Sequence, residues 1–470
     1  MKIEKNYKNL HTSIDKVSFS DKNLSPKMKS HFGRFTSSNI LQVDSFYIRK
    51  KTGKITFYPF HLSKLIKQPF FGIINLTIKT IGGCFMFKVY NTQEDIARGL
   101  SDIFQEIIPD IRKTQLKIIP YIIHGMIISE SLVPLDIAKV LKGDFSLIQL
   151  QSVIKRIKRL FVNKHFNPYD FYDKIIRYVI ANYRKKHKDK RVHIIFDHMY
   201  VKDHFTVLLF SMRVGKQGIP LWFRCFEGKD CPEAFKEELI TDGISYVASL
   251  FDDDMDLIYL ADRWFNSTSI MEHIKSLGKT YVIRLKKNLS ILHFDKKDGH
   301  KVWKTLEELP KYKYHAQIYK DVELTEKLHI TNIVISNSVD TDEPWILATN
   351  KNPTRAIKDY GYRFGGIESI FKNQKSNGFY LENSIACTLK YFKSEYCFSC
   401  IGILFLTILG TDYAKNTRSY KNTKIRTHIT VRGIKTRTLS LFNTGLTLFH
   451  RAFESLKYVR LSFRFILYDA

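Results

Sequence analysis

The sequence predicts an α/β fold, a mixed β-sheet flanked by helices. Two apolar runs, 192–197 and 257–262, each end in an aspartate, as buried strands do when they reach the edge of a sheet. Between them, strand-like segments at 205–214 and 219–226 surround the turn Gly215-Lys216-Gln217-Gly218, which predicts a hairpin. Helix-like segments separate the later strands, and this alternation is typical of helices packed on the faces of a sheet.

The order of the predicted elements narrows the fold further. The first strand and the hairpin are followed by a helix at 232–251, the strand that ends in Asp262, a helix at 266–277 and a strand at 280–285. Strand, hairpin, helix, strand, helix, strand is the order of a ribonuclease-H-like sheet. Residues 289–345 then contain short strand-like pieces, which predict a mostly β insertion before residues 345–350 return the chain to the core.

The two strand-end aspartates are candidate metal ligands. If the strands are neighbours, Asp197 and Asp262 lie side by side and repel each other, and a hard divalent cation relieves this repulsion. Glu368, in a later helix-like stretch, supplies a third carboxylate. The alternative is that each aspartate merely caps a turn. The acidic run 252–254, with Asp256, is interpreted as a loop after a helix, because consecutive carboxylates do not converge on one ion.

The composition indicates a globular protein with a polyanionic partner. The chain has 470 residues, 44% of them apolar, and 75 Lys and Arg against 46 Asp and Glu give a net charge of +29. Nucleic acid is the leading candidate. A membrane surface is the alternative, but the cations are spread along the chain instead of lying on one amphipathic helix.

Targeting and cysteine signals are weak. The first residues lack an apolar stretch, so the protein is expected to remain inside the cell. The apolar run 396–410 is shorter than the roughly twenty residues that span a bilayer, which favours a buried core helix. Six scattered cysteines do not form a disulfide framework and are interpreted as core thiols.

The predicted organisation has five parts. Residues 111–185 are helical, and a short helix, a turn at 142–145 and a basic-faced helix at 146–161 suggest a DNA-binding helix-turn-helix, with an ordinary helical hairpin as an equal alternative. The basic C-terminal region suits sequence-independent phosphate contact. The parts are a basic region of unassigned fold (1–110), the helical region (111–185), the catalytic core (192–288 and 346–410), the β-rich insertion (289–345) and the basic tail (411–470).

Three segments carry a resemblance to a known family: Ala261-Asp262-Arg263-Trp264-Phe265, residues 281–288, and residues 360–376. Together they resemble the DDE transposases of insertion sequences, in the branch marked by the signature Tyr-x2-Arg-x3-Glu-x6-Lys. Tyr360, Arg363, Glu368 and Lys375 match this signature, except that four residues separate the arginine from the glutamate. One extra residue rotates a helix by about 100°, so Arg363 is expected in the loop before the helix, where two glycines absorb the offset.

The resemblance implies a ribonuclease-H-like core whose Asp197, Asp262 and Glu368 are the catalytic residues and hold two ions of Mg²⁺ or Mn²⁺. It also places basic and aromatic side chains on the DNA, with Lys375 near a phosphate. For Lys375 the alternative is an ion pair within its helix, and for the other cations it is solvated surface charge. The predicted DNA-binding residues are Tyr360, Arg363, Lys375, Lys372, Arg263, Arg284, Lys286 and Lys287.

The function that the resemblance implies is transposition. The enzyme would hydrolyse double-stranded DNA at the terminal inverted repeats of its own element and join the 3′-hydroxyl to target DNA. Relatives act as homodimers in a synaptic complex, and a cytoplasmic, nucleoid-associated location is expected, without a membrane partner. Two alternatives stay open: a ribonuclease-H-like nuclease without strand transfer, and a domesticated DNA-binding protein that no longer catalyses.

Overall fold

The computed structural model describes ten stretches of the chain. They are residues 40–43, 46–51, 54–59, 93–141, 150–184, 191–295, 299–337, 343–416, 425–431 and 434–455. The chain divides into two units, residues 1–78 and 79–470. The first contains an antiparallel sheet in the order β1-β2-β3, formed by Ile40–Val43, Phe46–Lys51 and Lys54–Pro59. The predicted region 1–110, which had no assigned fold, therefore includes a small β-sheet.

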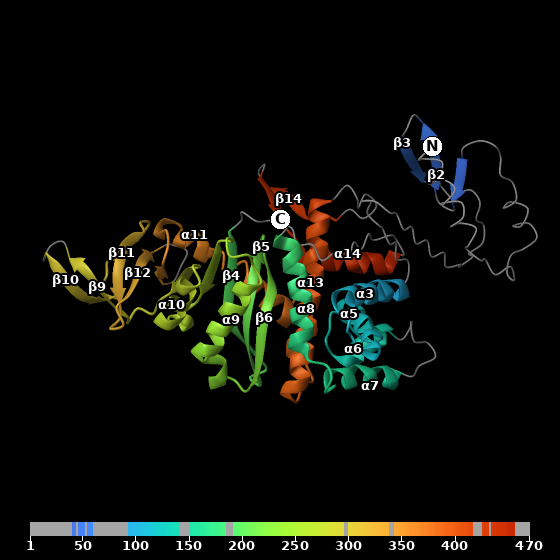
Figure 1. Cartoon of the computed structure of the whole chain (residues 1–470), viewed down its shortest axis with the longest axis horizontal. Helices are drawn as coiled ribbons and strands as arrows, with labels where there is room; N and C mark the ends of the chain where they lie inside the picture. The colour runs from blue at the N-terminus through green and yellow to red at the C-terminus, as the bar shows by residue number, and fades with distance from the viewer. Residues whose placement is uncertain are drawn as a thin grey trace, which may run out of the picture. The chain divides into compact units, whose positions relative to one another are not determined.

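A ten-stranded mixed sheet organises the second unit (Figure 1). Its order is β10-β9-β11-β12-β13-β8-β7-β4-β5-β6. Helices flank it, which confirms the predicted mixed α/β architecture. The strands are β4 (Val192–Val201), β5 (Phe205–Val214), β6 (Gln217–Glu227), β7 (Leu257–Ala261), β8 (Thr280–Arg284), β9 (Ser290–Asp295), β10 (His300–Thr305), β11 (Gln317–Leu324), β12 (His329–Ser336) and β13 (Trp345–Thr349).

Strands β4 to β8 form one half of this sheet. β5 and β6 pair antiparallel, which confirms the predicted hairpin, and β4 pairs antiparallel with β5. β7 lies parallel to β4 on one side and to β8 on the other. All five residues of β7 are buried, because a parallel strand in the centre of a sheet is covered on both faces. Apolar side chains without interruption are therefore what this position requires.

Strands β9 to β13 form the other half. The sequence predicted a mostly β insertion at 289–345 but not where its strands would pair. In the structure they continue the same sheet: β12 pairs with β13, and β13 pairs antiparallel with β8. The inserted strands therefore lengthen the core sheet beyond β8.

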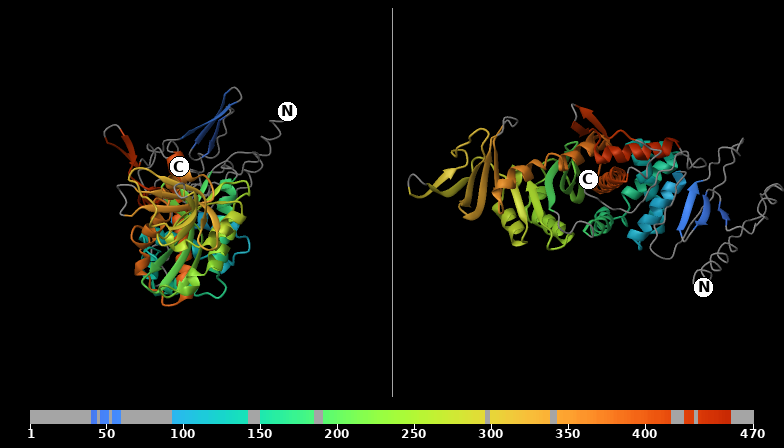
Figure 2. Two further views of the ribbon diagram at one scale, coloured as in Figure 1. Left: turned by 90° about the vertical axis from the view of Figure 1, so that its left-hand side faces the viewer. Right: turned by 90° about the horizontal axis from the view of Figure 1, so that it is seen from above.

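Helices cover both faces of the β4–β6 hairpin region (Figure 2). Side chains alternate between the faces of a strand, and β6 shows this directly. Trp222 lies near Gly243 of α9 (Glu237–Ser249), whereas Phe223 packs against Tyr396 of α13 (Leu389–Lys415), with ring centroids 4.9 Å apart. The opposite directions of these neighbouring residues place α9 and α13 on opposite faces.

A group of helices precedes the sheet in the chain. They are α3 (Gln93–Ile107), α4 (Lys113–Leu116), α5 (Ile119–Ser129), α6 (Pro134–Leu141), α7 (Leu150–Phe161) and α8 (Pro168–Arg184). α6 and α7 pack together, but the predicted helix-turn-helix turn at 142–145 lies outside the described residues. Lys155, Arg156, Lys158 and Arg159 are exposed on α7, as the predicted basic face requires.

Helix α13 is the longest described helix. The predicted core segment 396–410 is its central part, and the whole helix of 27 residues is long and apolar enough to cross a membrane, with a mean hydropathy of 1.6 in its most apolar stretch. In this structure 89% of that stretch is buried. It packs closely on α14 (Leu441–Ser455) through Gly410 and Gly445, where an added Cβ would meet the opposite backbone at 1.9 Å. It is therefore a core helix of this fold.

Glu395 lies inside the core on α13 and is fully buried. The hydroxyl of Ser384 donates a hydrogen bond to one of its carboxyl oxygens, and the other oxygen has no partner among the described residues. Burial raises the pKa of Glu395 to about 8, against a smaller opposing effect of Ser384 and Lys202. The folded protein therefore favours the neutral acid.

This burial predicts a pH-dependent stability. Because the folded pKa lies above the unfolded value, the contribution of Glu395 is complete below about pH 4.5 and is lost as the pH rises to about 8. The loss amounts to about 1.4 kcal/mol per pH unit across that window. Glu395→Gln should remove this component. Urea unfolding of wild type and Glu395→Gln from about pH 5 to pH 9 measures this component. If the free energy of unfolding of the two proteins changes with pH in the same way, the folded protein does not raise the pKa of Glu395.

Candidate active site

The register of β4 and β7 brings two of the predicted aspartates together. The parallel pairing runs from Val192 opposite Leu257 to Ile195 opposite Leu260. Continued by two residues, it sets Asp197 opposite Asp262, which directly follows the last residue of β7. The prediction that β4 ends at Asp197 is wrong: the strand continues to Val201, because its other edge stays paired with β5. The aspartate nevertheless lies just past the point where its pairing with β7 stops.

Glu368 approaches from α12 (Ile367–Lys375), in the first turn of the helix. This turn is held against the sheet at two points. The hydroxyl of Ser369 accepts a hydrogen bond from the backbone N–H of Gly218 at 3.0 Å. Gly366 lies so close to β4 that an added Cβ would be 2.1 Å from Cδ1 of Ile195. The glutamate side chain is 46% exposed, so its carboxylate lies at the open side of the site.

Arg363 contacts all three acids. It lies in the connection between α11 (Ala356–Gly361) and α12, as its spacing from Glu368 predicted. Its Nη2 donates to Oδ2 of Asp197 at 2.5 Å and lies 3.7 Å from Oδ2 of Asp262. Its Nη1 lies 3.5 Å from Oε1 of Glu368. One guanidinium therefore contacts three carboxylates that are 65 to 171 positions apart in the sequence.

The electrostatics of this cluster are unbalanced. Three carboxylates face one guanidinium, a formal excess of two negative charges. Burial raises the pKa of Asp197, and the neighbouring Asp262 adds to the increase while Arg363 opposes it. Burial likewise raises the pKa of Glu368, with Arg363 again opposing. Burial by itself would lower the pKa of Arg363, but the carboxylates, Asp197 above all, raise it.

The donor chemistry of the cluster fits a hard divalent cation. Carboxylate oxygens are the ligands that Mg²⁺ and Mn²⁺ prefer, and here they surround a group that is itself a cation. With the guanidinium between them, the carboxylates stand apart, and in the described part of the chain no three His, Cys, Asp or Glu side chains are close enough to hold a metal ion. The chemistry of the three carboxylates thus suits a hard cation, but with Arg363 between them their arrangement does not form a metal site.

Two predicted DNA-binding residues point inward. The side chain of Tyr360 is 1% exposed and packs edge-on against Trp345, with ring centroids 5.0 Å apart. The side chain of Arg363 is 7% exposed and is paired with the three carboxylates. In this conformation both side chains are buried, and their contact with DNA stays a prediction. Tyr360 is a buried residue near the end of α11, from which the connection that carries Arg363 begins.

Two further predicted DNA-binding residues, Lys375 and Lys372, lie on α12. Lys375 forms an ion pair with Glu382 at 3.1 Å, so its partner is neither Glu368 nor another residue of its own helix. Lys372 is exposed, and the described residues show no acidic partner for it. The structure thus leaves Lys372 accessible to a ligand and holds Lys375 by a pair at the surface.

Two of the four basic residues predicted near the strand ends, Arg263 and Arg284, share one partner. Arg263 and Arg284 both donate to Oε2 of Glu343, at 2.9 and 3.1 Å. Lys286 lies over the ring of Trp264, with Nζ 5.2 Å from the ring centroid. Lys287 instead pairs with Glu307 at 2.7 Å. Sequence reasoning missed Glu343, because nothing local marks a residue that pairs with side chains 59 and 80 positions away.

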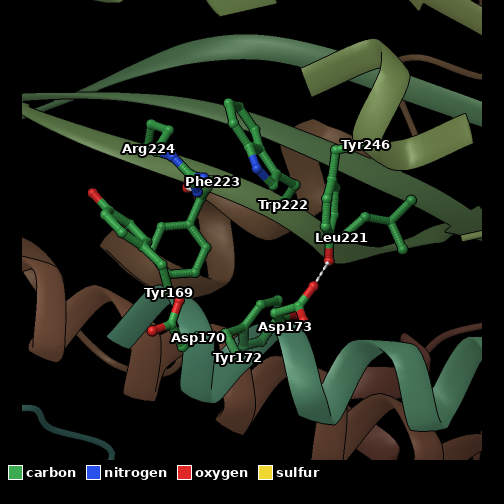
Figure 3. A pocket seen from close by; sticks show the side chains of 9 residues that line it. All are labelled: Tyr169, Asp170, Tyr172, Asp173, Leu221, Trp222, Phe223, Arg224 and Tyr246. Atoms are coloured by element: carbon green, nitrogen blue, oxygen red, sulfur yellow. Dashed lines mark hydrogen bonds between the residues drawn. The ribbon is translucent and has the colours of Figure 1, made fainter. Parts of the chain in front are cut away.

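A separate pocket of about 160 Å³ lies between α8, α9 and β6 (Figure 3). Its walls are aromatic, and the hydroxyl of Tyr246 donates to Asp173 at 2.6 Å. The guanidinium of Arg224 lies over both Tyr169 and Trp222, 4.4 Å from each ring centroid. This pocket contains none of the predicted site residues.

Comparisons with known proteins do not identify a family for this chain. No protein-family model matches the chain, and no curated protein matches it. Among solved structures, the chain is similar to a piggyBac transposase in a synaptic complex with hairpin DNA, determined by cryo-EM. The TM-score is 0.38 and the sequence identity 11%, over 77% of this chain and 78% of that one. A TM-score of 0.38 does not establish a shared fold.

Proposed function

We propose that this chain is a DNA transposase with a ribonuclease-H-like catalytic core. The observation that carries the proposal is the convergence of Asp197, Asp262 and Glu368 on one guanidinium. The strand order β6-β5-β4-β7-β8, with β4, β5 and β6 antiparallel and β4, β7 and β8 parallel, agrees with the ribonuclease-H-like order of elements that the sequence predicts.

Asp197, Asp262 and Glu368 would hold the divalent ions. When bound, such ions supply a Lewis acid for the phosphate and a means of generating a hydroxide or alkoxide nucleophile. The residues of the chain position the substrate. The excess of positive charge draws the DNA backbone in, and the phosphate contacts fix its register without selecting a sequence.

Arg363 has a defined part in this proposal. In the DNA-free state it is the counter-cation of the three carboxylates. A phosphate of bound DNA offers the guanidinium another anionic partner with matching bidentate geometry. Its withdrawal toward the DNA would open the carboxylates to the metal ions, so that metal binding follows substrate binding.

The geometry also favours a second candidate function. A guanidinium that is paired with three carboxylates can be a structural ion-pair network, as expected in a domesticated DNA-binding protein that no longer catalyses. In that case the three acids stabilise the fold, and removing one of them leaves Arg363 less well paired and destabilises the protein. In the catalytic case the three acids would bind the metal ions.

The experiment that tests the proposal uses the purified full-length protein, Mg²⁺ or Mn²⁺, and labelled duplexes carrying the inverted repeats that flank its coding region. We expect nicking at the repeat ends and joining of the 3′-hydroxyl to a plasmid. Nicking without joining identifies a nuclease. Binding without any metal-dependent cleavage identifies the domesticated protein and refutes the proposal. Homodimer formation on paired ends is the expected state of the active complex.

A further inference from the structure

Trp264 is an unusual residue for its position. Its side chain is 70% exposed, although it lies only two residues from Asp262. The turn that carries it, Arg263–Phe265, is fixed at both ends. Asp262 accepts a hydrogen bond from the backbone N–H of Arg263 at 2.6 Å, and the buried ring of Phe265 stacks on His198 with centroids 4.9 Å apart. The indole is therefore held outward by an anchored turn.

The surroundings of the indole are cationic. Lys286 lies over its ring, and Arg263 and Arg284 share the single carboxylate of Glu343. Lys286, Arg263 and Arg284 carry three positive charges here, against the negative charges of Glu343 and of Asp262. A purely apolar partner would have to desolvate these charges without compensation. A ligand that combines a flat π-surface with an anionic group satisfies both features.

An unpaired nucleotide has this combination. Its base stacks on an aromatic ring, whereas the bases within an intact duplex are already stacked on each other. Its phosphates pair with Lys and Arg side chains. The location of Trp264 agrees with such a ligand. Asp262, two residues away, belongs to the carboxylate cluster and lies 3.7 Å from Arg363. A base stacked on Trp264 would therefore come from the DNA at the cleavage position.

We propose that Trp264 is a stacking platform for an unpaired nucleobase beside the carboxylate cluster, with Lys286 and Arg263 contacting the adjoining phosphates. The inference rests on the proposed function only in taking DNA as the ligand. It adds a preference for substrates whose strands are separated at the cleavage position.

The test compares two probes in metal-free buffer. One is a fully paired duplex, and the other has the same sequence with an unpaired 3′ tail that carries 2-aminopurine. Fluorescence anisotropy gives the affinity, and 2-aminopurine fluorescence reports stacking. The variants are Trp264→Ala, Trp264→Phe and, as a matched control, Trp303→Ala. Trp303 is also exposed, at 47%, but belongs to β10, in the inserted part of the sheet.

We expect Trp264→Ala to weaken binding of the tailed probe about 5- to 150-fold, the factor for one base stacked on one aromatic ring, and to leave the paired probe unchanged. The 2-aminopurine quenching should disappear with it. Trp264→Phe should retain much of both, and Trp303→Ala should behave as wild type. Because Trp264 is exposed, its replacement should leave the Tm unchanged.

Three results would overturn the inference: equal affinity of wild type and Trp264→Ala for the tailed probe, an equal loss on both probes, or an equal effect of Trp303→Ala. Each of these requires that wild type binds DNA. If wild type binds neither probe, the proposed function fails and the inference falls with it, so the two failures are distinguishable.

Discussion

Asp262→Asn is expected to lower metal-dependent cleavage by on the order of 1000-fold while leaving DNA binding nearly intact. The substitution keeps the shape of the side chain but removes a charged ligand, and the charge stabilisation that a metal supplies is worth several kcal/mol in the transition state. Asp197→Asn and Glu368→Gln should have the same effect, because the three carboxylates converge on one position. Cleavage rates and binding isotherms on the same duplex measure the two quantities separately.

The matched control is Asp254→Asn. Asp254 belongs to the acidic loop between α9 and β7 and is exposed there, away from the cluster. Its replacement should leave cleavage unchanged. Full cleavage by any one of the three cluster variants would remove that residue from the site. Loss of folding in all three, seen as a Tm drop without DNA or metal, would instead support the structural role of the ion pairs.

Arg363→Gln is expected to change metal binding in the opposite direction. Without DNA, the variant should bind Mn²⁺ about tenfold more tightly than wild type or better, because the ion no longer competes with a guanidinium that contacts all three acids. Electron paramagnetic resonance of free Mn²⁺ measures this without any cleavage. Cleavage itself should fall, because the arginine is also needed to hold the substrate phosphate.

Stability supplies a second measurement on the same variant. Removing the guanidinium leaves the partly buried carboxylates without a counter-charge, so Arg363→Gln should have a lower Tm, by an amount that corresponds to about 3–5 kcal/mol. Mn²⁺ should restore it and should raise the Tm of wild type much less. Unchanged or weaker Mn²⁺ binding by the variant would show that Arg363 organises the carboxylates instead of competing with the ion.

Much of the site was predictable because the local sequence specifies where a buried strand ends. An unbroken apolar run specifies a buried strand, and two parallel strands in register place the residues beyond their ends side by side, which is how Asp197 meets Asp262. The helix of Glu368 was also recognisable from its local pattern. The extent of β4 was not, because its last four residues are held by pairing with β5 and not by their own composition.

The inward direction of Arg363 could not be predicted from the sequence. It depends on the close approach of Gly366 to Ile195, a contact between segments 171 positions apart that fixes where the α11–α12 connection passes over the sheet. The shared partner of Arg263 and Arg284 is a similar case. Long-range contacts of this kind leave no periodic or compositional mark, so the ion pairs of Arg363 with the three acids could not be predicted from the sequence.

The central claim is that Asp197, Asp262 and Glu368 form one metal site that Arg363 occupies until DNA binds. Crystals of the DNA complex grown with Mn²⁺, measured at the manganese absorption edge, test it most directly. The account predicts anomalous density about 2 Å from oxygens of all three side chains, with the Arg363 guanidinium moved to a phosphate. Density at other acids, or a guanidinium still bound to Asp197 in the complex with DNA and Mn²⁺, would contradict it.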